Sequence, residues 1–185
     1  MDDLIRRAKR PVMVVAHPDD ESLFGAGIML RYPGNWEVIC CTKPSRDPER
    51  IELLKKACDV LGATCRVVDQ FEEAELRFDQ LGIDGADLIV THNRDGEYGH
   101  KHHKLLHEAV TNQFPSKTIC FGYRPKRLSV ADFAIELNAE ECAKKMAAIQ
   151  CYDNIGSSGR PTWTQLLDYF APRYDLWHEP YERFC

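Results

Sequence analysis

The feature that most constrains the fold is a short apolar run that is followed at once by a cluster of polar residues, within segment 11–30. Residues 12–16 are apolar and mostly β-branched, which is typical of a strand buried on both faces of a parallel sheet. Pro18 cannot extend a central strand, so we expect the strand to end there. Apolar residues then recur at a helical spacing, at Leu23, Ala26, Gly27 and Leu30. The segment therefore predicts a strand, a turn and a helix.

The turn of this unit holds one imidazole and three carboxyl groups in residues 17–21. In open α/β sheets, ligands bind at the carboxyl edge of the strands, which is where this turn would lie. Nitrogen and oxygen donors at such an edge suit a divalent metal. The same carboxylates also favour the N-terminus of a helix, so this cluster alone leaves a metal site and a helix cap as equal alternatives.

The rest of the chain repeats the alternation of strands and helices. Strands are expected over 36–42, 63–69, 86–91, 118–123 and 128–137, and helices over 2–9, 48–61, 100–114, 139–152 and 162–170. Segment 70–81 is ambiguous, a turn is expected over 156–159, and the aromatic-rich tail 173–185 is expected to pack on the body. This alternation predicts one α/β domain over 1–185 with a mainly parallel sheet.

Composition limits the partners and the compartment. The 185 residues carry a formal net charge of −5, which argues against nucleic acid or an anionic membrane as the main partner. No apolar run approaches the ~20 residues of a membrane span, and no secretory signal is evident, so we expect a cytoplasmic protein. The eight cysteines form no C-x-x-C pair and are expected to be reduced. A small-molecule substrate fits these limits, and the oligomeric state stays open, a homo-oligomer included.

A second polar cluster follows the fourth expected strand. Segment 91–110 holds five of the seven histidines of the chain. His103 shares a helix face with His100, three residues before it, and with His107, four residues after it. His102 points elsewhere and is expected to be solvated. The alternative interpretation is a solvated helix face that happens to be rich in histidine.

Both clusters follow strands, so both are expected at the carboxyl edge of the sheet. If the first and fourth strands are neighbours, His17 and Asp20 meet the imidazoles of the second cluster. Two imidazoles and one carboxylate leave an open coordination position, which is the arrangement of a catalytic rather than a structural zinc site.

Two motifs carry a resemblance to a known family. Residues 16–21, AHPDDE, resemble the signature of the LmbE-like, or PIG-L, zinc deacetylases, and residues 99–103, GHKHH, resemble their second motif, G-H-x-x-H. The resemblance spans the first to the fifth expected strand, with a weaker match in the helix that ends near Tyr152. It implies a Rossmann-like three-layer sandwich, a Zn²⁺ cofactor that Fe²⁺ or Co²⁺ can replace, and removal of the acetyl group from an N-acetylglucosamine-type sugar or sugar conjugate.

The resemblance also implies roles by motif position. His17, Asp20 and His103 would bind zinc, Asp19 would be the general base, and His100 would stabilise the tetrahedral intermediate. Zinc makes water acidic enough to supply hydroxide near neutral pH. Asp19 lies beside a metal ligand without being one, so it can take the proton of the water that the metal activates.

Two departures from the family pattern affect the catalytic histidine and the second helix. His102 stands where many relatives carry an aspartate that orients the catalytic imidazole, and Asp95 or Glu97 is the candidate replacement. Arg50 matches a family arginine, but Leu53 stands where relatives carry a glutamate three residues later.

Three further residues are predicted to contact the substrate. Arg50 is a candidate for a sugar hydroxyl or a phosphate, with a solvated helix arginine as the alternative. His92 and Asn93, at the end of the fourth expected strand, complete this set. Glu21 suits support of the helix N-terminus and of the metal ligands better than chemistry.

Alternative functions fall into three classes. An amidase acting on a thiol-sugar conjugate or another N-acyl compound keeps the metal and changes the bond. A metal-holding binding module without turnover would not need Asp19 beside the ligand Asp20. A nucleotide-binding Rossmann domain is disfavoured because no G-x-G-x-x-G follows the first strand.

Overall fold

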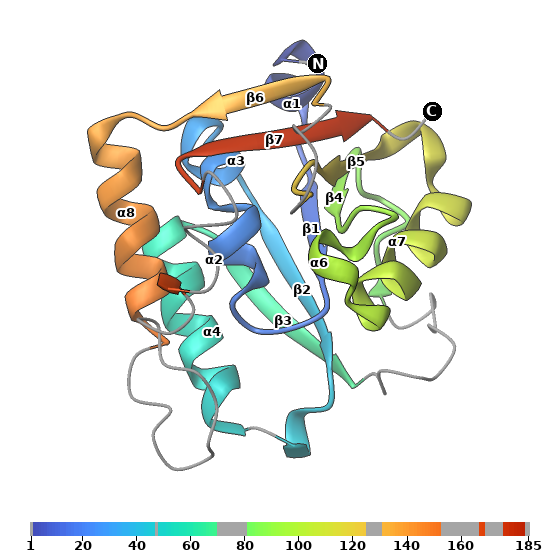
Figure 1. Cartoon of the computed structure of the whole chain (residues 1–185). Helices are drawn as coiled ribbons and strands as arrows, with labels where there is room; N and C mark the ends of the chain where they lie inside the picture. Colours follow the sequence, from blue (N-terminus) through green and yellow to red (C-terminus); the bar gives the residue numbers. More distant parts are fainter. Residues whose placement is uncertain are drawn as a thin grey trace.

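The computed structural model describes residues 2–46, 48–69, 81–124, 131–152, 167–168 and 176–183. Seven strands form one sheet in the order β3-β2-β1-β4-β5-β7-β6, with helices packed on both of its faces (Figure 1). The strands are β1 Pro11–Val15, β2 Glu37–Thr42, β3 Thr64–Asp69, β4 Leu88–Thr91, β5 Thr118–Phe121, β6 Phe133–Glu136 and β7 His178–Arg183. Strands β1 to β5 are parallel to one another, whereas β7 is antiparallel to both β5 and β6. The predicted α/β fold with a mainly parallel sheet is therefore confirmed.

The helices form two layers around the sheet. Their bounds are α1 Asp2–Arg7, α2 Asp20–Phe24, α3 Ala26–Arg31, α4 Pro48–Leu61, α6 Gly96–Gly99, α7 Lys101–Gln113 and α8 Ala139–Gln150, with short 3₁₀ helices at Pro44–Arg46 and Pro115–Lys117. Strand β1 is buried along its whole length. Met13 and Val15 of β1 lie in the core under α3, α4 and α8, whereas Val12 and Val14 lie in the core under α7. A strand buried on both faces needs the continuous apolar run that residues 12–16 supply.

The first and fourth strands are neighbours in the sheet. Val14 of β1 is paired with Thr91 of β4, and the Thr91 hydroxyl donates a hydrogen bond to the Val14 carbonyl oxygen over 2.9 Å. The order of the strands reverses between β1 and β4, because β2 and β3 follow on one side and β5 on the other. The loops after β1 and β4 therefore diverge at one edge, the position where open α/β folds hold their ligands.

Three elements differ from the prediction. The helix expected after β1 is two helices, α2 and α3, broken at Gly25, where an added Cβ would lie 2.4 Å from the end of the Met13 side chain. The short helix α6 was not expected. The tail forms β7 between β5 and β6, where Glu179 and Pro180 are buried.

Some predictions lie outside the described residues. These are the ambiguous segment 70–81 except for Leu81, the turn at 156–159 and the helix at 162–170 except for 167–168. Cysteines in the described part of the chain are free thiols. Across the described ranges, no helix has both the length and the hydrophobicity that crossing a membrane would need.

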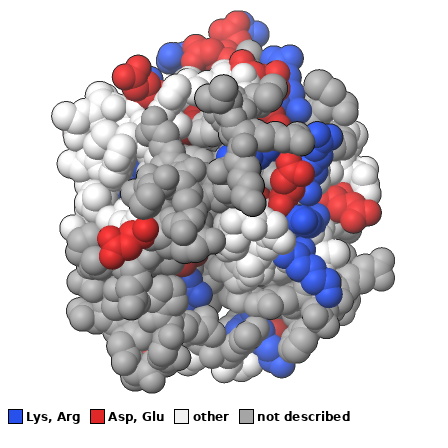
Figure 2. Space-filling view, viewed as in Figure 1, with Lys and Arg blue, Asp and Glu red and all other residues white. Residues whose placement is uncertain are grey.

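Charged side chains of both signs share the face seen in Figure 2. Lysine and arginine gather along the right side of this view, where α7 lies in Figure 1, and acidic side chains stand beside them.

Candidate metal centre

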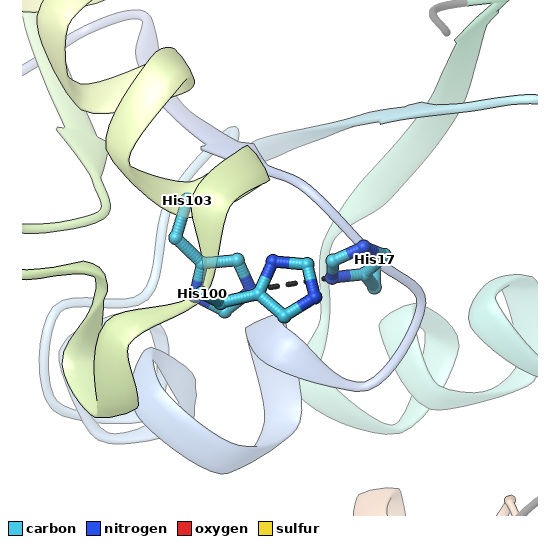
Figure 3. A group of neighbouring side chains, drawn as sticks. All are labelled: His17, His100 and His103. Atoms are coloured by element: carbon cyan, nitrogen blue, oxygen red, sulfur yellow. Dashed lines mark hydrogen bonds between the residues drawn. The ribbon is translucent and has the colours of Figure 1, made fainter. Parts of the chain in front are cut away.

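Two loops bring three donor atoms together at the edge between β1 and β4. His17 follows β1, His103 lies in the first turn of α7, and the two rings face each other (Figure 3). His17 Nδ1 lies 3.2 Å from His103 Nε2, and Asp20 Oδ2 lies 3.6 Å from the first atom and 3.5 Å from the second. Ligand bonds of about 2.0–2.2 Å in a tetrahedral site put the ligand atoms about 3.3–3.6 Å apart. The three residues predicted as ligands therefore have the spacing that a zinc ion needs.

Two other groups of donors overlap with this one. His17, His100 and His103 form one, and Asp20, His92 and His103 form the other. His92 is a weak candidate ligand because its Nε2 already accepts the backbone N–H of Ala16 over 3.0 Å. His103 belongs to every grouping, so it is the donor on which a metal at this edge most depends.

Glu97 fixes the orientation of His103. Its Oε2 lies 2.5 Å from His103 Nδ1 and 2.9 Å from His92 Nδ1. A histidine that donates one ring N–H to a carboxylate presents the lone pair of its other nitrogen to a metal. Burial acts to raise the pKa of Glu97, but His92 and His103 outweigh it and lower the pKa to about 2. From the sequence, Glu97 was a candidate partner for His100. In the structure it contacts His103, the predicted metal ligand.

Asp20 is buried in its ionised form. Its Oδ2 accepts the backbone N–H of His17 over 2.8 Å. Burial acts to raise the pKa of Asp20, but the neighbouring His103 and His92 lower it well below the usual value. An ionised carboxylate is the form that binds a metal.

Asp19 lies beside this donor cluster in an uncommon backbone conformation. Its φ is 115°, a region that residues with a side chain rarely adopt, and such conformations cost about 1–3 kcal/mol. Its Oδ2 is paired with the Nη2 of Arg50, and its backbone N–H donates to Glu21 Oε2 over 3.0 Å. Burial raises the pKa of Asp19 to about 6, against the opposing charge of Arg50. A carboxylate with such a pKa is a stronger base than an exposed aspartate.

His100 caps the N-terminus of α7 with its ring. Its Nδ1 accepts the backbone N–H of His102 over 3.3 Å, so the proton of a neutral ring lies on Nε2. The ring centroid of His100 is 4.6 Å from those of both His17 and His103. A backbone amide therefore orients His100, whereas Asp95, the other candidate partner, pairs with Arg124 over 2.6 Å.

The prediction that His102 is solvated is wrong. His102 is only 3% exposed and lies edge-on to His17 with the ring centroids 5.3 Å apart. Neither of its ring nitrogens has a hydrogen-bond partner within the described part of the chain. Burial, followed by the nearby His17, lowers the pKa of His102 to about 3. Both His102 and His103 in the first turn of α7 are buried, so this turn packs against the protein on two sides. The helical spacing of the sequence did not indicate this.

His92 and Asn93, which are predicted to contact the substrate, lie in the protein interior. Both side chains are fully buried. Asn93 Nδ2 donates to the carbonyl oxygens of Phe121 and Tyr123 over 2.9 Å and 2.8 Å. These contacts tie the loop after β4 to the end of β5, so the two residues support the site from inside.

The sequence did not reveal the partner of Glu21. Glu21 is fully buried, and its Oε1 accepts the Tyr152 hydroxyl over 2.8 Å. Tyr152 follows α8, more than a hundred residues away. A partner so distant in sequence leaves no local signal.

Comparisons with known proteins bear on the fold. No protein-family model matches the chain. An uncharacterized protein of Acanthamoeba polyphaga mimivirus is 27% identical over 138 residues, which are 60% of this chain and 61% of that relative. The chain thus matches less than two thirds of the length of this curated relative.

Two solved structures resemble nearly the whole chain. GalB, the 4-carboxy-2-hydroxymuconate hydratase of Pseudomonas putida KT2440, has a TM-score of 0.64 and 16% identity, covering 94% of this chain and 95% of its own. The N,N'-diacetylchitobiose deacetylase of Pyrococcus horikoshii has a TM-score of 0.63 and 14% identity, covering 97% of this chain and 85% of its own. At these identities the likeness shows the fold alone, a Rossmann-like α/β fold that a hydratase and a deacetylase share.

Proposed function

We propose that the protein is a metal-dependent hydrolase that removes the N-acetyl group from an N-acetylglucosamine-type sugar or sugar conjugate. The observation that carries the proposal is the convergence of His17 Nδ1, Asp20 Oδ2 and His103 Nε2 within 3.2–3.6 Å. The AHPDDE and GHKHH motifs supply these residues, and they resemble those of the LmbE-like deacetylases. The chain has the fold of a diacetylchitobiose deacetylase, which is consistent with the proposal.

Zinc is the proposed ion, with Fe²⁺ and Co²⁺ as alternatives for the same ligands. His17, Asp20 and His103 would hold it, and Glu97 would keep the Nε2 of His103 directed at it. When bound, zinc supplies Lewis acidity, which makes water a stronger acid and polarises a carbonyl group.

The side chains around the ion would carry the proton transfers. Asp19 takes a proton from the attacking water, whose oxygen forms a bond to the acetamide carbon. The Nε2–H of His100 donates a hydrogen bond to the carbonyl oxygen as negative charge develops on it. The C–N bond then breaks, the proton held by Asp19 passes to the nitrogen, and acetate and a free amine result. In the same addition step, Asp19 therefore acts on the attacking water and His100 acts on the carbonyl oxygen.

An amine-release assay tests this proposal. The panel contains N-acetylglucosamine, a nucleotide-linked N-acetyl sugar, an N-acetylglucosaminyl lipid and an N-acylated thiol-sugar conjugate. We expect release from at least one acetylated sugar, loss of release with a chelator, and recovery when zinc is added back. Release from the thiol-sugar conjugate alone would favour the amidase alternative. Release that a chelator does not affect would contradict metal-dependent hydrolysis.

Asp19→Ala separates a hydrolase from a metal-holding binding module. We expect the variant to keep its metal, by elemental analysis, and to lose hydrolysis by about 10²–10⁴-fold because the proton acceptor is gone. His103→Ala is the matched variant, which should lose the metal as well. Full activity of Asp19→Ala would remove Asp19 from the mechanism.

A further inference from the structure

The side chain of Asp19 is held in place from outside the helix that follows it. Asp19 precedes α2 at the N-cap position, but its side chain makes no capping hydrogen bond to that helix. Its φ of 115° is one of two positive φ values among the non-glycine residues that the structure describes. The contact that holds its carboxylate therefore comes from another element.

Arg50 supplies the contact to the carboxylate. It extends from the first turn of α4, and its Nη2 donates hydrogen bonds both to Asp19 Oδ2 and to the Pro18 carbonyl oxygen. The side chains of Arg50 and Asp19 are only 12% and 11% exposed. One guanidinium nitrogen thus joins the side chain of Asp19 to the backbone of the turn that carries it.

Glu21 supplies the contact to the backbone. Its Oε2 accepts the N–H of Asp19, while its Oε1 accepts hydroxyl groups from Ser22 and Tyr152. Asp19 is therefore anchored at its amide by Glu21 and at Oδ2 by Arg50.

We propose that Arg50 is a positioning residue that holds Asp19 in the geometry for proton abstraction, rather than a residue that binds the substrate. The proposal rests on the proposed function, in which Asp19 is the base. A planar guanidinium that makes two directed hydrogen bonds fixes a carboxylate better than a point charge does. Nη2 donates to the turn that carries the base, and the side chain is largely buried, which favours a role on Asp19 over a contact to the sugar.

Steady-state kinetics of Arg50→Ala and Arg50→Lys distinguish the two roles. If Arg50 positions Asp19, Arg50→Ala lowers kcat by about 100-fold, because a base misplaced by about 1 Å costs that much. KM stays within about twofold, since no contact to substrate is lost. Arg50→Lys recovers part of kcat because its ammonium pairs with Oδ2 but lacks the fixed planar geometry. Lys56→Ala, which removes an exposed charge from the same helix, is the control and should match the wild type.

A double-mutant cycle with Asp19→Ala excludes a merely structural role. Once Asp19 is absent, Arg50→Ala should cause no further loss of kcat. An equal further loss in that background, or a rise in KM with kcat unchanged, would overturn the proposal. The unfolding temperatures of all variants identify any loss of kcat that comes from misfolding. If Arg50→Ala is misfolded, the kcat and KM of Arg50→Lys decide between positioning of Asp19 and binding of the substrate.

A crystal structure of Arg50→Ala tests the positioning of Asp19 independently of the proposed function. If the wild type releases no amine from any substrate, the function fails, but the structure of Arg50→Ala still tests the positioning. We expect the Asp19 carboxylate to turn away and its φ to leave the positive region. An unchanged Asp19 in that structure would show that Arg50 does not position it.

Discussion

Glu97 is the residue on which the orientation of two buried imidazoles depends. One carboxylate oxygen contacts the Nδ1 atoms of both His92 and His103, and its partner oxygen accepts the backbone N–H of Asn93 over 3.0 Å. His103, which is predicted to bind the metal, is thus fixed by the carboxylate of Glu97, a residue five positions after His92. At this scale the centre depends on directed contacts more than on the identity of its ligands.

Glu97→Gln tests this dependence. The amide oxygen can still accept one ring N–H, but the negative charge that strengthens the ligand is lost. We expect the Kd for zinc to rise about 10–100-fold, measured by competition with a chromogenic chelator. Glu108→Gln, at an exposed position of α7, is the control and should leave the Kd unchanged. Equal affinities of Glu97→Gln and the control would show that His103 needs no carboxylate behind it.

At the scale of elements, the N-terminus of α8 is closed by a capping box and an ion pair. Asn138 accepts the backbone N–H of Glu141 over 3.0 Å, and Glu141 accepts that of Asn138 over 2.9 Å. Arg31, at the end of α3, lies 2.7 Å from Glu141. The hydrogen bond to Arg31 lowers the pKa of Glu141 below 4.5, against the effect of burial. This contact ties α8 to α3, the second helix after the loop that follows β1.

Glu141→Gln isolates the charge of this contact, because glutamine also completes a capping box. A carboxyl group with a lowered folded pKa stabilises the fold above its unfolded pKa and loses that effect as pH falls through the folded pKa. We therefore expect the variant to be less stable than the wild type above about pH 4.5, by up to about 1 kcal/mol for a partly exposed pair. Urea unfolding from pH 7 to pH 2.5 should show the difference shrinking below pH 4.5. A difference that is constant with pH would exclude the charge as its cause, and the exposed Glu140→Gln is the control.

The antiparallel strand β7 approaches the end of β5 closely at Gly122. A Cβ on Gly122 would lie 2.9 Å from three atoms of Pro180, two of them in the backbone. Gly122→Ala should therefore lower the free energy of unfolding by about 1–3 kcal/mol, as overpacking does. Gly34→Ala is the matched control, since nothing lies within 4 Å of its added Cβ. Equal unfolding free energies of the two variants would contradict this packing of β7.

At the scale of the whole molecule, one buried ion pair joins α8 and β7 to the helices α2 and α3. Lys145 and Glu179 are both fully buried and paired. Lys145 also donates to the Leu23 carbonyl oxygen over 2.9 Å, and both oxygens of Glu179 accept the Gly27 N–H over 2.8 Å. Helix α8 therefore anchors α2, which begins within the first motif, and β7 anchors α3.

Glu179→Ala should destabilise the protein by about 3–5 kcal/mol, because it leaves the charge of Lys145 buried without its counterion. The double variant Lys145→Met with Glu179→Leu should be closer to the wild type, because an apolar pair of similar size removes that charge. Unfolding by urea measures both. A double variant less stable than Glu179→Ala would show that the two residues act separately.

Much of this architecture could be predicted from the sequence, for physical reasons. The apolar runs predicted β1, β2, β4 and β5 because these strands are almost wholly buried and are therefore mainly apolar, and Pro48 and Gly62 marked the ends of α4. Strand β7 could not be predicted, because Glu179 and Pro180 are unusual in a strand and are accommodated only by partners distant in the sequence.

The candidate site divides in the same way. The meeting of His17 and Asp20 with the histidines of α7 was expected on condition that β1 and β4 are neighbours, and the choice of His103 among these histidines came from the resemblance to a family. The contacts of Arg50 to Asp19 and of Glu97 to His103 depend on how loops and helices from different segments meet. No period or motif in the sequence encodes such contacts.

The central claim is that one metal ion is held between the loop after β1 and the first turn of α7. Anomalous diffraction at the zinc absorption edge from crystals of the zinc-loaded protein tests it most directly. We expect a single strong peak about 2.0–2.2 Å from His17 Nδ1, Asp20 Oδ2 and His103 Nε2. An ion bound without His17 and Asp20, or no peak at this edge of the sheet, would contradict the account.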